Sequence, residues 1–342
     1  MRQLMFYGPH DVRWEARPDP ELDDDRAALV RPVAVATCDI DVAALRGGYP
    51  LAGPYPLGHE GVARVVAVGA GVSSVRVGQL VVVPFQISCG TCPNCLRGRT
   101  GNCAAHPPLS TYGLGQMGGL GWGGLFADLV RVPHADAMLV ALPEGSDPVA
   151  LASASDNIPD GWRAVGPQLA AEPGAEVLVL GGQPASIGLY AAGLAVTLGA
   201  QRVHYVDSDA GRLDIARALG AEAANVAVDE LPRKVGAFPI VVDASGTERG
   251  LRCALNSVAF DGTCTSTFVY LEDPSLPMFS MYSRCCTLHT GRVHARPAIP
   301  RVLEAVARGF DPGLVTSAIV AWDDLADALR DPPMKLVAIR PG

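Results

Sequence analysis

Residues 177–195 read VLVLGGQPASIGLYAAGLA, and this stretch decides the fold of the second half of the chain. An apolar run leads into a turn that contains Gly181, Gly182 and Gly188, and a helical pattern follows. The small residues at 191–193 would let this helix lie close against a sheet. The order of strand, turn and helix is typical of a unit that holds the pyrophosphate of a dinucleotide at a helix N-terminus.

Strands and helices alternate on the C-terminal side of this unit. We expect strands at 203–206 and 240–243 and helices at 211–219 and 248–257. Such alternation predicts an α/β fold with a parallel, doubly wound sheet of the Rossmann type. We therefore assign residues 154–294 to a dinucleotide-binding domain.

The first part of the chain has a different sequence pattern. Short β-branched runs at 63–68, 79–84 and 126–132 are separated by Gly and Pro, and helical patterns are scarce. This pattern predicts a barrel-like, all-β domain over residues 1–153. A chain of 342 residues exceeds one compact core, so two domains are the expected organisation.

Composition excludes several classes of function. Hydrophobic residues make up 49% of the chain and charged residues 18%, which indicates a soluble globular protein. The net charge is −8 with no Lys/Arg cluster, so neither nucleic acid nor a membrane is an expected partner. The N-terminus carries no signal-like apolar run, and the longest apolar stretch, 189–198, is far shorter than a span of about 20 residues. We expect a cytoplasmic protein whose nine cysteines are thiols or metal ligands.

Four cysteines form the most specific motif of the sequence. Cys89, Cys92, Cys95 and Cys103 follow the pattern Cys-x2-Cys-x2-Cys-x7-Cys in a segment rich in Gly, Pro and Asn. This spacing lets four thiolates surround one Zn²⁺ tetrahedrally, which leaves no open position and predicts a structural role. The alternatives are an iron–sulfur cluster and four buried free thiols.

The turn at 181–188 departs from the common G-x-G-x-x-G motif, because Gln183, Pro184 and Ala185 occupy its middle. Asp207 strengthens the assignment, since it ends the next predicted strand, where a carboxylate hydrogen-bonds ribose hydroxyls and repels a 2′-phosphate. NAD is therefore favoured over NADP. The candidate cofactor contacts in the turn and helix are Gly181, Gly182, Ser186, Ile187 and Gly188.

Cys38 in TCDID and His59 in LGHEG precede the cysteine motif, and each alone is weak evidence for a metal site. Together with the four cysteines and the dinucleotide unit, GHEG makes the chain resemble the zinc-containing medium-chain alcohol dehydrogenases, of the medium-chain dehydrogenase/reductase superfamily. The resemblance covers nearly the whole chain and extends through RVHARPAIPRVLEAV at 292–306 to KLVAIR at 335–340.

This resemblance implies an overall organisation. The first domain would be GroES-like, with residues 295–342 returning to it. Each chain would bind two Zn²⁺ ions, one structural and one catalytic, and use NAD to act on a small alcohol or carbonyl substrate. The family also implies a homodimer or homotetramer.

The resemblance further implies the ligands of the catalytic zinc. The family takes one Cys, one His and a third ligand from a segment that here reads LASASDNIPDGW, so Cys38, His59 and Asp156 are the expected set. Three protein ligands leave one position open, as a catalytic zinc requires. Asp156 has an alternative interpretation as a helix cap or turn residue.

Family matches suggest roles for four further residues. Asp41 resembles the carboxylate that accepts a hydrogen bond from the ligand histidine, and Glu60 resembles a glutamate that tunes the metal. The alternatives are a strand-end Asp and a solvated Glu. Arg212 matches a residue that contacts the adenosine ribose, with a helix-surface Arg as the alternative. Ser245, followed by Gly246, matches part of the adenine pocket, although a plain strand-to-helix turn explains these two almost as well.

Three residues depart from the family pattern of zinc-assisted hydride transfer between an alcohol and nicotinamide. Ile40 stands where a Ser or Thr commonly relays the proton, so Asp39, Glu60 or water would take over that role. Asp39 also lies beside the expected pyrophosphate, and Asp160 replaces a Thr that commonly touches the nicotinamide.

Three functions follow as hypotheses. The first is an NAD-dependent dehydrogenase of a secondary alcohol or polyol. The second, motivated by Ile40, is a zinc-supported conjugate (ene) reductase of an α,β-unsaturated carbonyl. The third is a non-catalytic zinc- and nucleotide-binding scaffold, against which the retention of Cys38, His59 and Asp156 argues.

Overall fold

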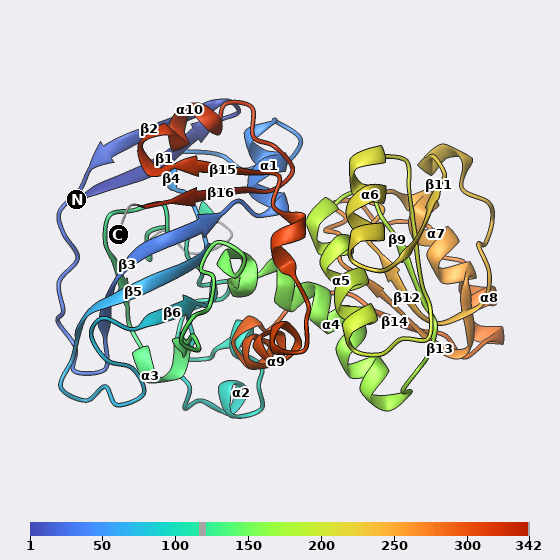
Figure 1. Cartoon of the computed structure of the whole chain (residues 1–342), viewed down its shortest axis with the longest axis horizontal. Helices are drawn as coiled ribbons and strands as arrows, with labels where there is room; N and C mark the ends of the chain where they lie inside the picture. Colours follow the sequence, from blue (N-terminus) through green and yellow to red (C-terminus); the bar gives the residue numbers. More distant parts are fainter. Residues whose placement is uncertain (116–120, 341–342) are drawn as a thin grey trace. The chain divides into compact units, whose positions relative to one another are not determined.

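The structure is a computed structural model that describes residues 1–115 and 121–340. Contacts divide the chain into two compact units (Figure 1). The first contains Met1–Pro159, His294–Pro300 and Thr316–Gly342, and the second contains Asp160–Val293 and Arg301–Val315. Relative to the boundaries expected from sequence, residues 154–159 and His294 group with the first unit, and residues 301–315 group with the second.

The first unit is built from two β-sheets (Figure 1). The larger sheet has the strand order β15-β16-β3-β5-β6-β8 with β7 paired to β3, and the smaller sheet has the order β2-β1-β4. The strands are β1 (Arg2–Gly8), β2 (Asp11–Ala16), β3 (Ala28–Ala36), β4 (Tyr55–Pro56), β5 (Glu60–Val68), β6 (Leu80–Val83), β7 (Val130–Val132), β8 (Val140–Ala141), β15 (Ala318–Ala321) and β16 (Leu336–Ile339).

Inward-facing side chains of both sheets form one hydrophobic core in this unit. Val30 and Val35 of β3 and Val65 of β5 join Phe6 of β1 and Tyr55 of β4 in it. Burial alternates along the first part of β3, from Ala28 to Ala34, as expected of a strand with one face on the core. The short helices of this unit are α1 (Asp39–Leu45), α2 (Pro93–Leu96), α3 (Ala135–Met138) and α10 (Leu325–Ala328).

The second unit contains a six-stranded, fully parallel sheet. Its strand order is β11-β10-β9-β12-β13-β14, which is the doubly wound Rossmann order, so the predicted fold class is confirmed. The strands are β9 (Val177–Leu180), β10 (Val203–Asp207), β11 (Glu222–Asn225), β12 (Phe238–Asp243), β13 (Val258–Ser266) and β14 (Thr287–His289).

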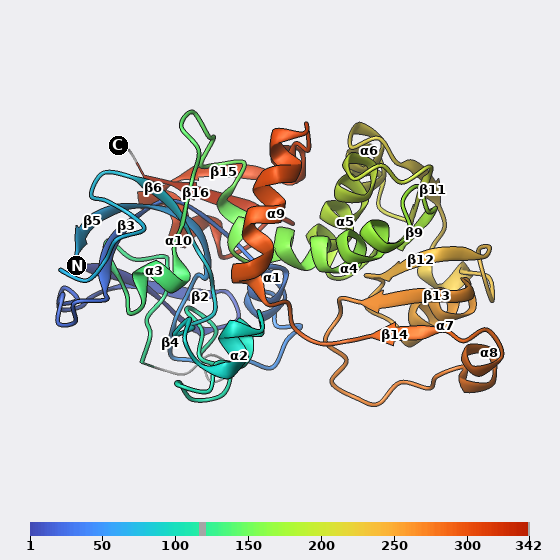
Figure 2. The ribbon, with the colours of Figure 1, turned by 90° about the horizontal axis from the view of Figure 1, so that it is seen from below.

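Helices cover both faces of this sheet. Figures 1 and 2 show α5 (Ala185–Thr197) and α6 (Ala210–Ala218) on one face and α7 (Glu248–Asn256) on the other. The remaining helices are α4 (Asn157–Ala171), α8 (Met278–Ser283) and α9 (Ala295–Ala307), and the boundary between the units falls within α4 and α9.

The central helix α5 is buried from Ala185 to Ala195, which explains its largely apolar sequence. A Cβ at Gly193 would meet ring and methyl carbons of Phe310 and Leu219 at 2.8 and 2.9 Å. The small residues in this helix therefore permit the close packing that the sequence predicts.

Three details differ from the sequence-based expectations. The strand expected at 126–132 covers only Val130–Val132, and the helix expected at 299–308 begins earlier, at Ala295. A short helix, α1, follows Cys38 in the part of the chain where helices looked scarce. Among the described residues, the helices are all too short or too polar to cross a membrane.

Candidate metal and dinucleotide sites

The first unit brings Cys38, His59 and Asp156 together. Their ligand atoms all lie within 4.8 Å of one another. Strands β3 and β5 pair antiparallel with Ala36 opposite Glu60, so the residues that flank this pair, Cys38 and His59, meet at one edge of the sheet. Asp156 arrives from a distant part of the chain, after a 3₁₀ turn at Ala152–Ser155.

Hydrogen bonds clamp the segment that carries Asp156 onto β5. The Ser155 hydroxyl accepts a hydrogen bond from the Gly61 N–H at 2.9 Å and donates one to the Gly61 carbonyl at 3.0 Å. The backbone N–H of Asn157 donates to Glu60 Oε1 at 3.1 Å, and its side-chain amide donates to Asp39 Oδ2 at 3.2 Å. These bonds on both sides fix the position of Asp156 between them.

The ligand atoms of Cys38, His59 and Asp156 lie close together, with few hydrogen-bond donors beside them. Asp156 Oδ2 lies 3.3 Å from Cys38 Sγ and 3.4 Å from His59 Nε2. Both ring nitrogens of His59 are buried without a hydrogen-bond partner among the described residues. A buried imidazole, thiol and carboxylate that converge in this way fit a divalent cation, because a cation satisfies all three at once.

The electrostatics of these groups also suit a cation. Burial raises the pKa of the Cys38 thiol well above its ordinary value, and the Asp156 carboxylate adds to the shift. Burial disfavours the charged imidazole, but the carboxylates of Asp41 and Asp156 outweigh it and raise the pKa of His59 to about 9. The site therefore attracts positive charge, and Zn²⁺ at this place would reverse both shifts by ionising the thiol and deprotonating the imidazole.

Asp41 lies behind His59, as expected, but at a longer distance than a hydrogen bond. Its Oδ1 atom is 3.6 Å from His59 Nδ1, and both atoms lack a partner among the described residues. Its other oxygen accepts a hydrogen bond from the Cys38 backbone N–H at 3.0 Å, in the first turn of α1. Asp41 thus links two candidate ligands, and burial raises the pKa of its carboxyl.

Sequence reasoning missed two residues of this site. Asn157 connects Glu60 to Asp39, and its Oδ1 atom lies 3.1 Å from Cys38 Sγ. Lys335 is completely buried, and its ammonium group donates to Glu60 Oε2 at 3.1 Å. The only local signal for Lys335 is a single lysine at the start of an apolar strand-like segment, which does not indicate its partner.

The four cysteines of the spacing motif converge in a separate group of the first unit. Cys89, Cys92, Cys95 and Cys103 meet the same 4.8 Å limit, and all four are free thiols. Backbone N–H groups point at the sulfur atoms: Cys92 N–H lies 3.3 Å from Cys89 Sγ, and Cys89 N–H lies 3.4 Å from Cys103 Sγ. The N–H groups of Cys95 and Ala104 lower the pKa of Cys92 to about 6. Four thiols with donors aimed at them fit a structural Zn²⁺.

In the second unit, the predicted dinucleotide residues meet at the carboxyl ends of three neighbouring strands. Gly181 follows β9, Asp207 ends β10 and Ser245 follows β12, while Ser186, Ile187 and Gly188 lie in the first turn of α5. A Cβ at Gly181 would meet Asp207 Oδ2 at 2.4 Å, and one at Gly182 would meet the Ser245 carbonyl at 2.6 Å. The glycines therefore bring these turns into direct contact.

Asp207 is held from several sides. Arg212 binds it with two hydrogen bonds of 2.7 Å, from Nε and Nη2, and the Tyr205 hydroxyl donates at 2.9 Å. Burial works against ionisation, but the hydrogen bonds from Arg212 keep the pKa of Asp207 below its ordinary value. Ser245 points its hydroxyl inward to Asp243 Oδ1 at 2.6 Å, so in this structure it orders its own turn.

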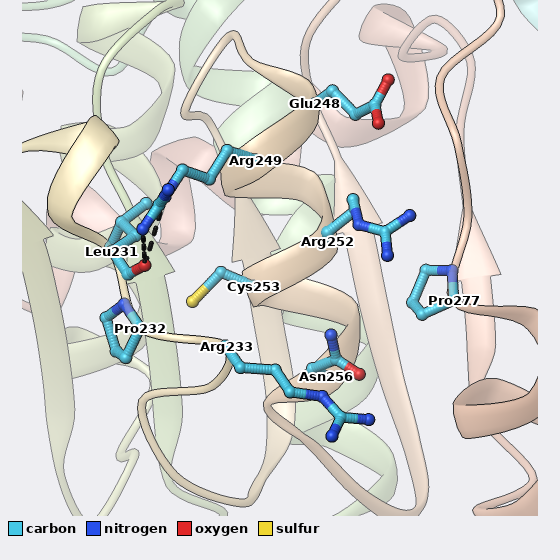
Figure 3. A pocket seen from close by; sticks show the side chains of 9 residues that line it. All are labelled: Leu231, Pro232, Arg233, Glu248, Arg249, Arg252, Cys253, Asn256 and Pro277. Carbon is cyan, nitrogen blue, oxygen red and sulfur yellow. Dashed lines mark hydrogen bonds between the residues drawn. The ribbon is translucent and has the colours of Figure 1, made fainter.

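A cavity of about 530 Å³ lies elsewhere in the second unit, beside α7 (Figure 3). Arg233, Arg252 and Asn256 are among the residues that line it, while Arg249 binds the Leu231 carbonyl. Its lining contains none of the predicted metal or cofactor residues, so this cavity is distinct from both candidate sites.

Comparisons with known proteins match both units. The model of the alcohol dehydrogenase GroES-like domain matches residues 24–144, and the model of the zinc-binding dehydrogenase matches residues 186–308. The chain is 32% identical over 315 residues to a probable zinc-binding alcohol dehydrogenase of Mycobacterium tuberculosis, covering 90% of this chain and 79% of that protein. It is 30% identical to the L-galactonate-5-dehydrogenase of Escherichia coli over 93% of this chain and 89% of that protein.

A solved structure agrees with these relatives. The alcohol dehydrogenase TADH from Thermus sp. ATN1 superposes with a TM-score of 0.85 at 28% identity, and the match covers 100% of both chains. The GroES-like first domain expected from the sequence is thereby confirmed.

Proposed function

Because the chain belongs to the zinc-containing medium-chain dehydrogenase/reductase family, we propose that it is an NAD(H)-dependent zinc dehydrogenase of a secondary alcohol or polyol. It is an oxidoreductase of the alcohol dehydrogenase type. The cofactor preference, the substrate class and the two zinc ions per chain are parts of the proposal.

The convergence of Cys38, His59 and Asp156 carries this proposal. These three side chains would fill three positions of a tetrahedral zinc ion and leave the fourth open. The four cysteines of the other group would fill all four positions of their ion. Zinc bound at the first site supplies a Lewis acid that lowers the pKa of an alcohol. The side chains of Cys38, His59 and Asp156 would hold that ion, and Asp41 and Asn157 contact Cys38 and would orient it.

Asp207 supports the choice of NAD. A carboxylate at the end of the second strand of a Rossmann unit accepts hydrogen bonds from both ribose hydroxyls and repels a 2′-phosphate. Here Arg212 and Tyr205 orient the Asp207 carboxylate, so little conformational freedom is lost on binding a ribose.

The proton released from an alcohol needs a route that does not pass through Ile40. This side chain stands in the first turn of α1, between Asp39 and Asp41, and has no group that transfers a proton. Asp39 is buried and bonded to Asn157, which also contacts Cys38, so Asp39 is the carboxylate best placed to accept the proton in its stead.

The same observation at Ile40 supports a second candidate function, conjugate reduction of an α,β-unsaturated carbonyl. The experiment supplies secondary alcohols and polyols with NAD, and enals with deuterated NADH, to the zinc-loaded protein. We expect reduction of NAD by at least one alcohol. Deuterium on the β-carbon of enals, with no turnover of any alcohol, would establish the ene-reductase instead.

A scaffold without catalysis is tested by the same samples. Turnover of nicotinamide that disappears in Asp156→Ala while the fold persists excludes it. Binding of zinc and nucleotide with no turnover of any substrate in either direction would support it.

A further inference from the structure

We propose that Lys335 is a positioning residue that holds the Glu60 carboxylate away from the catalytic metal, so that the open position stays available to substrate. This inference rests on the proposed zinc at Cys38, His59 and Asp156. It concerns a residue that acts through another, because the Lys335 ammonium donates to the Glu60 carboxylate and to the Thr37 carbonyl.

Lys335 occupies an unusual environment for a lysine. The residue precedes β16 and is completely buried. Its Nζ atom donates to the Thr37 carbonyl at 2.6 Å and to Glu60 Oε2 at 3.1 Å. Thr37 directly precedes the candidate ligand Cys38, and Glu60 directly follows His59. A buried ammonium is costly unless it is paired, so the position of Lys335 depends on these two acceptors.

Glu60 is restrained at both oxygens. Oε1 accepts the hydrogen bond from the Asn157 N–H at 3.1 Å, and Oε2 accepts the one from Lys335. The side chains of Glu60 and Lys335 are both fully buried, so water does not screen their attraction. The carboxylate is thus fixed between Lys335, which directly precedes β16, and the segment that carries Asp156.

The charges at the proposed zinc site explain why Glu60 would need to be restrained. A Cys38 thiolate and an Asp156 carboxylate would neutralise a divalent zinc, with His59 as a neutral ligand. A third anionic ligand would lower the Lewis acidity of the ion and take the open position. Glu60 is the adjacent anion that can do so, and the Lys335 ammonium offsets its charge. Without that ammonium, the buried carboxylate would gain most by moving to the cation.

The test uses the full-length protein with Co²⁺ in the catalytic site, because the visible absorption of Co²⁺ reports its coordination. Lys335→Met removes the ammonium and keeps the length of the side chain. We expect weaker visible absorption than in the wild type, as four-coordinate Co²⁺ gains a fifth ligand. We also expect release of Zn²⁺ from this site to a chelator to slow, and kcat to fall, each by roughly tenfold.

Glu60→Gln provides the matched control, since it removes the charge that Lys335 restrains. In the Glu60→Gln background, adding Lys335→Met should leave the Co²⁺ spectrum and the Zn²⁺ release rate unchanged. If Lys335→Met alone does not fold, a spectrum of the double variant that differs from that of Glu60→Gln still overturns the proposal. A spectrum that Lys335→Met changes equally in both backgrounds overturns the proposal, as does an unchanged spectrum in the folded single variant.

Failure of this inference is distinguishable from failure of the proposed function. If wild-type protein takes up no Co²⁺ at Cys38, His59 and Asp156, the proposed catalytic site is wrong. If it takes up Co²⁺ and oxidises alcohols but ignores Lys335→Met, only the role of Lys335 is wrong.

Discussion

Asp156 Oδ2 lies 3.4 Å from His59 Nε2, although the two residues come from distant parts of the chain. The segment Ser155–Asn157 reaches this position because Gly61, Glu60 and Asp39 bind it. A carboxylate held so close to an imidazole and a thiol is the geometric basis of the proposed catalytic zinc.

Replacing Asp156 tests that zinc directly. Asp156→Ala should reduce the zinc content from two ions per chain to one and lower kcat/KM more than about a hundredfold, since even outer-shell partners commonly contribute tenfold or more. Metal analysis and steady-state kinetics provide the measurements. Asp214→Ala, on the exposed side of α6, should change neither quantity. Two zinc ions retained in Asp156→Ala would remove this residue from the ligand set.

The cysteine group should affect stability more than chemistry. Cys95→Ser removes one buried ligand, and a loss of about 3 kcal/mol would lower Tm by about 10 °C in a domain of this size. Differential scanning calorimetry and zinc analysis check this. Cys286→Ser, outside the group, is the matched control and should keep both zinc ions. An unchanged Tm with one zinc missing would contradict a structural role.

Cofactor preference should depend on Asp207. Asp207→Ser removes a charged acceptor, and such hydrogen bonds contribute about 1.5–3 kcal/mol, so kcat/KM for NAD should fall by about tenfold or more. The value for NADP should stay constant or rise, because the repulsion of the 2′-phosphate is lost and Arg212 is released to bind it. Kinetics with both cofactors measure the ratio. Equal losses of kcat/KM for NAD and NADP would show that Asp207 does not distinguish a ribose 2′-hydroxyl from a 2′-phosphate.

The same carboxylate should make stability depend on pH. The pKa of Asp207 in the folded chain lies below its ordinary value, so the ionised form contributes stability above the unfolded pKa of about 4. That contribution is lost as the pH falls through the folded pKa. The difference in unfolding free energy between wild type and Asp207→Asn should therefore be largest near pH 6 and shrink toward pH 3. Denaturant titrations at several pH values measure it, and a constant difference would contradict the assignment.

Much of the architecture could be predicted from local patterns. The strand at Val177–Leu180 and the helices beginning near Ala185 and Glu248 lie where the periodicity predicted them, because each pattern is written within one short segment. The helix after Cys38 was missed, since it is short and depends on the Asp41 carboxylate accepting from the Cys38 N–H. The strand at 126–132 was overestimated, because only Val130–Val132 find a partner on β3.

Spacing and periodicity in the sequence determined the four-cysteine motif and the doubly wound fold class, since both act between near neighbours in the chain, whereas the set Cys38, His59 and Asp156 was implied by the family resemblance. Only the tertiary structure decided which charges share a buried space. Lys335 donates a hydrogen bond to Glu60, and Arg212 donates one to Asp207, because sheet pairing and helix packing bring these side chains within hydrogen-bond reach. In a low-dielectric interior such pairings fix the charge of a site, and no local pattern encodes them.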